Sequence, residues 1–186
     1  MKKIDFTYII NLNTSDKEIH ERLTKANYTE PFKYYIYPAV NGWGKDLKSK
    51  YKFKNADWWK IDSDNSFWNR EVTLGETGCM LSHYNVIKAA YDEGFKTILI
   101  LEEDFNPSGE YPSRLVLSEV PDDCSILYLD RNAMCSPSEE TRINKNVTKV
   151  GYTYNNHAYI VTRKGMKEVI DSKILDNIII SDEFFP

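Results

Sequence analysis

Segments rich in β-branched and aromatic residues alternate along this chain with longer segments of helical periodicity, and this alternation constrains the fold most strongly. The strand-like segments are residues 6–12, 34–40, 96–101, 125–129 and 157–162, and the helix-like segments are residues 16–27, 76–94 and 163–174. Strands that alternate with helices predict an α/β fold with a mostly parallel central sheet flanked by helices. The length of 186 residues suits a single domain spanning 1–186.

The charge and the cysteines exclude several classes of protein. The net charge is −4 and no block of like charge occurs, which argues against a nucleic-acid-binding face. Three cysteines without CxxC spacing argue against a disulfide framework and a structural zinc site. No apolar stretch has the length of a membrane span or of a signal peptide, so the sequence predicts a cytoplasmic or otherwise soluble intracellular protein.

Acidic residues stand where three of the apolar segments end. Glu102, Glu103 and Asp104 follow residues 96–101, Asp130 follows residues 125–129, and Asp182 with Glu183 follows the last apolar run, residues 178–180. In an open α/β sheet, ligands bind beyond the carboxyl ends of the strands. We therefore expect these carboxylates to face one crevice.

Clustered carboxylates suit a hard divalent cation such as Mg²⁺ or Mn²⁺. In an extended segment alternate side chains point to one side, so Glu102 and Asp104 would share a face and Glu103 would point away. An ion there would neutralise charge on a diphosphate leaving group. A second carboxylate, Asp182 or Glu183, would take the proton from an acceptor hydroxyl. The alternative for all of these acids is a solvated turn or a helix N-cap.

Several motifs, in a fixed order, resemble glycosyltransferase family 25. The stretch TLGETGCMLSHYNVIKAAYDEG, followed by KTILILEEDF, is similar to the central signature of that family. The segments YIINLNTSDKEIHERL, PAVNG, SILYLDR and AYIVTRKGMKEVI occur in the family's order. The final SDEFFP resembles an element of the procollagen galactosyltransferase branch, and the resemblance covers nearly the whole chain.

The resemblance implies a GT-A type fold and a metal-dependent reaction. It implies transfer of galactose or glucose from a UDP-sugar to a hydroxyl, with inversion at the anomeric carbon and with Mn²⁺ or Mg²⁺ as cofactor. The acceptor would be hydroxylysine of a collagen-like protein or a lipooligosaccharide-type glycan. Glu102 and Asp104 take the metal-binding positions, Glu103 replaces the family's usual Asp, and Asp182 and Glu183 take the catalytic positions.

Other matched residues are expected to bind the nucleotide sugar: Asn11, Leu12, Asn41, Gly42, Arg70, Glu76, Ser82, His83 and Glu103. Gly42 would let the backbone approach the nucleotide closely. Arg70 would pair with the diphosphate, or else form a surface salt bridge. Ser82 and His83 would contact the donor or the acidic loop, although a purely structural histidine fits equally well. Cys79 is expected to pack in the core.

Two other functions remain open at the level of sequence. Members of the family continue beyond the last motif, which predicts a C-terminally truncated or minimal transferase, and a non-catalytic nucleotide-sugar-binding module of the same fold is an alternative. Metal-dependent phosphoryl transfer or hydrolysis would also use clustered acids. The absence of P-loop spacing argues against it. The donor sugar, the acceptor and the oligomeric state stay undetermined.

Overall fold

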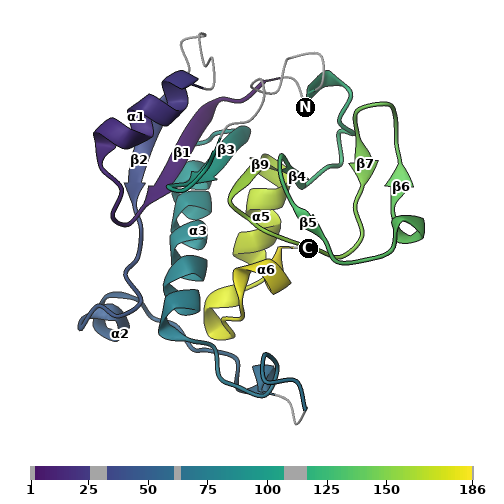
Figure 1. Cartoon of the computed structure of the whole chain (residues 1–186). Helices are drawn as coiled ribbons and strands as arrows, with labels where there is room; N and C mark the ends of the chain where they lie inside the picture. Colours follow the sequence, from purple (N-terminus) through teal and green to yellow (C-terminus); the bar gives the residue numbers. More distant parts are fainter. Residues whose placement is uncertain (1–2, 26–32, 61–63, 107–116, 186) are drawn as a thin grey trace.

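A computed structural model describes residues 3–25, 33–60, 64–106 and 117–185, and its centre is a five-stranded sheet (Figure 1). Across the sheet the strands are β2 (Tyr34–Pro38), β1 (Phe6–Asn11), β3 (Thr97–Glu102), β9 (Ala158–Thr162) and β4 (Ile126–Tyr128). β1 pairs in parallel with β2 and β3, whereas β9 runs antiparallel to both of its neighbours. The predicted α/β fold with a mostly parallel sheet is confirmed.

The remaining elements are helices and two small ribbons. The helices are α1 (Asp16–Lys25), α2 (Leu47–Lys50), α3 (Leu74–Asp92), α5 (Arg163–Asp171) and α6 (Ser181–Phe184), with 3-10 turns at Asp57–Trp59, Pro137–Glu139 and Ile174–Asp176. β5 (Asn132–Ala133) pairs with β8 (Thr153–Tyr154), and β6 (Thr141–Arg142) pairs with β7 (Thr148–Lys149). None of the helices in the described part of the chain has the length and apolarity needed to cross a membrane.

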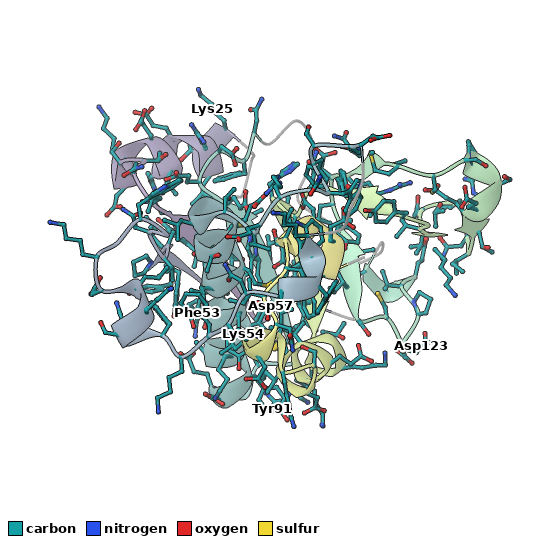
Figure 2. All side chains as sticks on the ribbon, turned by 90° about the horizontal axis from the view of Figure 1, so that it is seen from below. Lys25, Phe53, Lys54, Asp57, Tyr91 and Asp123 are labelled. Atoms are coloured by element: carbon teal, nitrogen blue, oxygen red, sulfur yellow. The ribbon has the colours of Figure 1, made fainter. Side chains whose placement is uncertain are left out.

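Successive residues of the central strands belong alternately to two hydrophobic clusters, one on each face of the sheet. Ile9 and Leu99 pack with Ile19 of α1, whereas Ile10 and Ile100 pack with residues of α3 and α5. The two helices of the second face contact each other. Figure 2 shows the same separation, with α1 on one side of the molecule and α3 with α5 on the other. The sheet is covered on both faces, so its central strands are mostly apolar.

α3 begins at a capping box and ends at a left-handed glycine. Thr73 and Glu76 form a capping box at its N-terminus. At the other end Gly94 has a φ of +84°, and the amides of Gly94 and Phe95 donate to the carbonyls of Tyr91 and Ala90. This Schellman arrangement needs a left-handed residue, which glycine adopts without a steric penalty.

The last apolar run differs from the expectation of a strand. Ile178 forms only an isolated bridge with Asn55, and the chain then enters α6. Asp182 and Glu183 therefore lie in the first turn of a short helix rather than at the end of a strand. Residues 45–72, between β2 and α3, contain α2 and a 3-10 turn at Asp57–Trp59, where Lys54 and Asp57 form an ion pair; both residues are labelled in Figure 2.

Several loops meet at one edge of the sheet. The parallel strands β1, β2 and β3 end there, and so does β4, because β4 and β3 both run antiparallel to β9. The amide of Glu102 donates to the carbonyl of His157, immediately before β9. Figure 1 shows the N-terminal half of α3 and the short α6 lying near each other below the sheet. This edge is the region where the sequence places its acidic motifs.

Candidate active site at the carboxyl edge of the sheet

Glu102, the last residue of β3, is half-buried and held by a histidine. Its Oε1 lies 2.8 Å from Nε2 of His83, whereas its Oε2 has no hydrogen-bond partner among the described residues. Burial alone would favour the protonated acid, but the hydrogen bond and charge of His83 outweigh it and lower the pKa of Glu102. Glu102 is therefore a carboxylate with one oxygen committed and one available to a ligand.

His83 is completely buried between two partners. Its Nδ1 lies 2.7 Å from the hydroxyl of Tyr159, opposite the Glu102 contact. Although burial disfavours the charged ring, the neighbouring Cys79 and Glu102 raise the pKa of His83 to about 10. The two ring nitrogens thus contact Glu102 on one side and Tyr159 on the other. The expectation that His83 contacts the acidic loop matches this geometry.

Cys79 lies beside this pair. Its Sγ is 3.9 Å from Oε1 of Glu102 and 3.4 Å from Oγ of Ser181, and the residue is half-buried. The expectation that Cys79 simply packs in the core is therefore wrong. Cys79 and His83 are four residues apart on α3, so both project from the same face of the helix toward the end of β3.

Asp182 is the second acid of this cluster. The backbone amides of Asn155 and Asn156 lie close to its carboxylate, and Asn155 adopts a left-handed φ of 77° at this turn. Burial raises the pKa of Asp182 above its ordinary value, the two amides oppose that change, and the negative charge of Glu102 adds to it. Asp182 thus retains a proton more readily than an exposed aspartate does.

Glu183 has a different environment from its neighbour. The hydroxyls of Tyr152 and Tyr154 both donate to its carboxylate. Its contact with these two donors raises the pKa of Tyr152 and Tyr154, after the larger effect of burial. Because both of its oxygens are occupied, Glu183 is less available as a proton acceptor than Asp182.

Glu103 binds the loop that follows β1. Its Oε2 accepts hydrogen bonds from the amides of Leu12, Asn13 and Thr14, at 3.0, 2.8 and 2.8 Å. Although burial raises its pKa, these amides outweigh that effect and lower it. Asn11 closes the same loop through its amide group, which donates to the carbonyl and accepts from the N–H of Thr14. Glu103 therefore couples the acidic motif to the β1 loop.

Asp104 is exposed, and the argument that placed it on the same strand face as Glu102 fails. β3 ends at Glu102, and the amide of Phe105 donates to the carbonyl of Glu102 at 3.0 Å. This hydrogen bond closes a turn with Glu103 and Asp104 at its centre. The side chain of Asp104 has no hydrogen bond or ion pair within the described parts of the chain, so its oxygens face solvent.

The loop after β2 packs tightly on the start of α3. Ser82 accepts from the amide of Val40 at 2.8 Å and donates to the carbonyl of Gly78 at 2.7 Å. A Cβ at Gly42 would lie 1.7 Å from the carbonyl oxygen of Leu74, so only glycine fits there. Gly42 therefore lets this loop approach the helix. Asn41 is exposed beside it, and its Oδ1 accepts from the amide of Trp43.

Arg70 and Glu76 bind each other. Two parallel hydrogen bonds of 2.8 and 2.7 Å join the guanidinium to the carboxylate. Glu76 also accepts from the amide and the hydroxyl of Thr73 at the start of α3. This geometry corresponds to the salt-bridge alternative for Arg70.

The third acidic motif lies at the end of β4. Asp130 is exposed and its carboxylate is 3.2 Å from Nε2 of His157. Nearby, the hydroxyl of Tyr128 and Nδ2 of Asn156 are buried and have no hydrogen-bond partner in the described ranges. A cavity of about 870 Å³ borders β4, the β6–β7 ribbon, α5 and α6, and Tyr128, Asp130 and Phe184 are among its lining residues.

The structure thus gathers Glu102, His83 and Asp182 with residues that the sequence did not single out for a function. Cys79, Tyr159 and Asn156 belong to this group, and so do the two tyrosines that bind Glu183. Their only sequence signal was position: Cys79 precedes His83 by one helical turn, and Tyr159 and Asn156 flank the start of β9. Arg70 and Glu76 are committed to each other, whereas Glu103 and Asn11 organise a loop.

Chemically, the edge offers oxygen ligands and a candidate base. The free oxygen of Glu102 and the exposed carboxylate of Asp104 are the hard donors that Mg²⁺ and Mn²⁺ prefer, so the residues present fit such an ion. The orphaned polar atoms of Tyr128 and Asn156 indicate room for polar ligands nearby. Asp182, with its raised pKa, is suited to accept a proton.

Comparisons with known proteins show which family and which relatives this chain resembles. Residues 4–118 match the family described as Glycosyltransferase family 25 (LPS biosynthesis protein). The chain is 31% identical to "Procollagen lysyl hydroxylase and glycosyltransferase" of Acanthamoeba polyphaga mimivirus, over 98% of this chain and 21% of the relative. It is 29% identical to a "Glycosyltransferase 25 family member" of Drosophila melanogaster, over 81% of this chain and 25% of the relative.

A human relative, "Procollagen galactosyltransferase 2", is 24% identical over 98% of this chain and 30% of its own length. The chain therefore spans between a fifth and a third of the length of these curated relatives. The family match covers more than half of the chain and includes the β1 loop, the start of α3 and the acidic motif after β3. This protein belongs to glycosyltransferase family 25.

Proposed function

We propose that this protein is a metal-dependent, inverting glycosyltransferase that moves galactose or glucose from a UDP-sugar to a hydroxyl acceptor. In this proposal residues 1–186 form one domain of GT-A type. Family membership supports the reaction class, and the names of the mimivirus and human relatives support a collagen-type acceptor over a lipooligosaccharide-type glycan. The single observation that carries the mechanism is that α6, whose first turn carries Asp182, lies against the Cys79–His83–Glu102 group, with Oγ of Ser181 3.4 Å from Sγ of Cys79.

The donor would bind over the loops that follow β1 and β2. Glu103 holds the amides of residues 12–14 in place, and Ser82 holds Val40 close to α3. Asn11, Leu12, Asn41 and Gly42 would then line the nucleotide pocket on a preorganised backbone. Arg70 and Glu76 would support this wall through the α3 N-terminus rather than contact the diphosphate, because each satisfies the other.

Glu102 and Asp104 would hold Mn²⁺ or Mg²⁺, which neutralises the charge that develops on the departing diphosphate. The carboxylate of Glu102 stays ionised because the His83 imidazolium donates to it. Tyr159 supports His83 from the opposite side. In this way the buried residues orient a metal ligand without contacting the substrate.

Asp182 would be the general base. As the acceptor oxygen bonds to the anomeric carbon, the bond from that carbon to the diphosphate breaks with its electrons, and the hydroxyl proton passes to Asp182. Attack from the side opposite the leaving group inverts the anomeric centre. Glu183 would instead orient the two tyrosines at the acceptor side.

The proposal is tested by Asp182→Asn. We expect kcat to fall by about 10²- to 10⁴-fold, the usual contribution of general base catalysis, while UDP affinity is retained. The measurement is UDP release from UDP-galactose and UDP-glucose with Mn²⁺ and a hydroxylysine-containing collagen-type peptide, beside calorimetric UDP binding. Asp171→Asn, on the exposed side of α5, is the control.

Different outcomes separate the candidate functions. Equal losses of UDP binding and turnover would make Asp182 a ligand instead of the base. UDP binding without turnover, with any of the donors and acceptors, would favour a non-catalytic nucleotide-sugar-binding module. Transfer to a lipooligosaccharide-type glycan but not to the peptide would mean that the acceptor is a glycan. Loss of turnover in Glu183→Gln but not in Asp182→Asn would identify Glu183 as the base.

A further inference from the structure

Three side chains with different ligand chemistry converge beneath the proposed donor site. Sγ of Cys79, an imidazole nitrogen of His83 and a carboxylate oxygen of Glu102 all lie within 4.8 Å of one another. Two of them come from one face of α3, four residues apart, and the third comes from the end of β3. Metal-binding helices use this same i, i+4 spacing to direct two ligands at one ion.

The composition of this group selects the class of metal. Thiolate and imidazole ligands favour Zn²⁺ over Mg²⁺ and Mn²⁺, which prefer oxygen. A combination of sulfur, nitrogen and carboxylate ligands lies within the set that binds Zn²⁺, and three protein ligands leave the fourth position to water. Such an open site differs from the closed, cysteine-rich structural sites that the cysteine spacing of this chain argues against.

The surroundings supply what a zinc-binding histidine requires. Nδ1 of His83 contacts the hydroxyl of the fully buried Tyr159 at 2.7 Å, so the ring is oriented with Nε2 toward Glu102 and Cys79. Metal-ligating histidines are usually held in this way through their other nitrogen. The side chain of Glu102 is 31% exposed and Cys79 is half-buried, which leaves an entry path for an ion from the donor side.

We propose that Cys79, His83 and Glu102 form a binding site for Zn²⁺. The ion replaces the thiol proton of Cys79 and the Nε2 proton of His83, and both protons are released to solvent. In the absence of the ion, hydrogen bonds among the same groups satisfy the buried imidazole. Zinc binding at this site is therefore independent of whether the protein is an active transferase.

One consequence rests on the proposed function. Glu102 belongs to the zinc site and also to the proposed Mn²⁺ site, so the two ions compete for the same carboxylate. Zn²⁺ is therefore expected to weaken Mn²⁺-dependent UDP binding in the parent protein. In Cys79→Ser this inhibition is expected to need at least about tenfold more Zn²⁺, because a thiolate ligand is missing.

The direct test uses Co²⁺ as a spectroscopic substitute on the full chain. A cobalt–thiolate bond gives a near-ultraviolet charge-transfer band, and we expect this band in the parent and its loss when Zn²⁺ is added. Cys79→Ser should lack the band. Cys124→Ser should keep it, because the half-buried Cys124 donates to the carbonyl of Ile126 away from this group and serves as the matched control.

A second variant probes the supporting hydrogen bond. Tyr159→Phe keeps the ring but removes the hydroxyl, and we expect Zn²⁺ affinity to fall by about 10- to 100-fold. Thermal unfolding of each variant without metal shows whether it is folded. A parent without the cobalt band, or a folded Cys79→Ser that keeps it, overturns the proposal.

Asp104→Ala distinguishes a failure of this site from a failure of the proposed function. The variant removes an assigned Mn²⁺ ligand that is not part of the zinc group, so UDP binding should be lost while the cobalt band remains. A cobalt band that depends on Cys79 in a protein that neither binds UDP nor transfers sugar would leave the zinc site established and the proposed function wrong.

Discussion

Glu103 illustrates how one residue departs from its family pattern and acquires a defined role. The carboxylate replaces the usual Asp of the acidic motif, and its longer arm reaches three successive backbone amides. Arg22 of α1 donates to the carbonyl of the same residue. The middle acid thus holds the loop after β1, whereas Oε2 of Glu102 and the carboxylate of Asp104 make no hydrogen bond within the described residues.

Glu103→Gln is expected to weaken both the loop and donor binding. Hydrogen bonds to a charged group contribute about 1.5–3 kcal/mol each and neutral ones about half as much, so we expect a loss of about 1–3 kcal/mol in unfolding free energy. UDP affinity should fall about tenfold, which corresponds to about 1.4 kcal/mol. Urea unfolding and calorimetry measure the two effects.

The control for this variant is Glu21→Gln on the exposed face of α1. Its ion pair with Lys17 lies in solvent, where such pairs contribute at most about 1 kcal/mol. Glu103→Asp should behave like Glu103→Gln if reach matters as much as charge. Unchanged UDP affinity in both Glu103 variants would mean that the loop after β1 does not contribute to donor binding.

At the level of single elements, the N-terminus of α3 supports the site through an acid, a hydroxyl and a guanidinium. Thr73 and Glu76 cap the helix, and Arg70 clamps Glu76. Burial raises the pKa of Glu76, but the contacts with Arg70 and Thr73 outweigh it and lower the pKa below the ordinary 4.5. The helix that carries Cys79 and His83 therefore begins at an ionised glutamate.

This ionisation predicts a pH dependence of stability. The folded-state pKa of Glu76 is below its unfolded value, so the stabilisation is fully present above pH 4.5 and disappears as pH falls through the lower folded value. Unfolding free energy, measured in urea at decreasing pH, should fall less steeply in Glu76→Gln than in the parent. Glu71→Gln, the exposed neighbour, should follow the parent. Identical slopes in Glu76→Gln and the parent would contradict the prediction.

At the scale of the whole molecule, the sheet separates two cores that affect the site differently. Leu99 and Ile100 are adjacent and fully buried, yet one packs toward α1 and the other toward α3. The α3 face carries Cys79 and His83, which lie next to Glu102. Because successive side chains of β3 point to opposite faces of the sheet, only substitutions on the α3 face are expected to affect the functional residues.

Leu99→Ala and Ile100→Ala test this separation. Each removes a buried aliphatic side chain, and we expect each to lower the unfolding free energy by about 2–5 kcal/mol. Only Ile100→Ala should also weaken UDP binding, because the cavity that this substitution creates lies against α3. The measurements are chemical unfolding and calorimetric titration at a temperature where both variants are folded. Equal effects on UDP binding would mean that the two cores are not independent.

The chain's local patterns were sufficient for the architecture and for much of α3. Apolar periodicity distinguished strands from helices, local capping residues such as Thr73 and Gly94 delimited α3, and the ordered motifs indicated the family that the comparisons confirm. These features depend on neighbouring residues, whose backbone preferences are set by local sterics and hydrogen bonding.

Tertiary structure alone decided the chemistry of individual side chains. It reversed β9, turned the segment with Asp182 and Glu183 into a helix, and ended β3 before Asp104. It also brought Cys79 and His83 to Glu102. Hydrogen-bond partners and charge environments depend on segments that are distant along the chain, so two adjacent acids in one motif can have unlike surroundings. Only the folded chain, in which each acid has its tertiary neighbours, distinguishes two such acids.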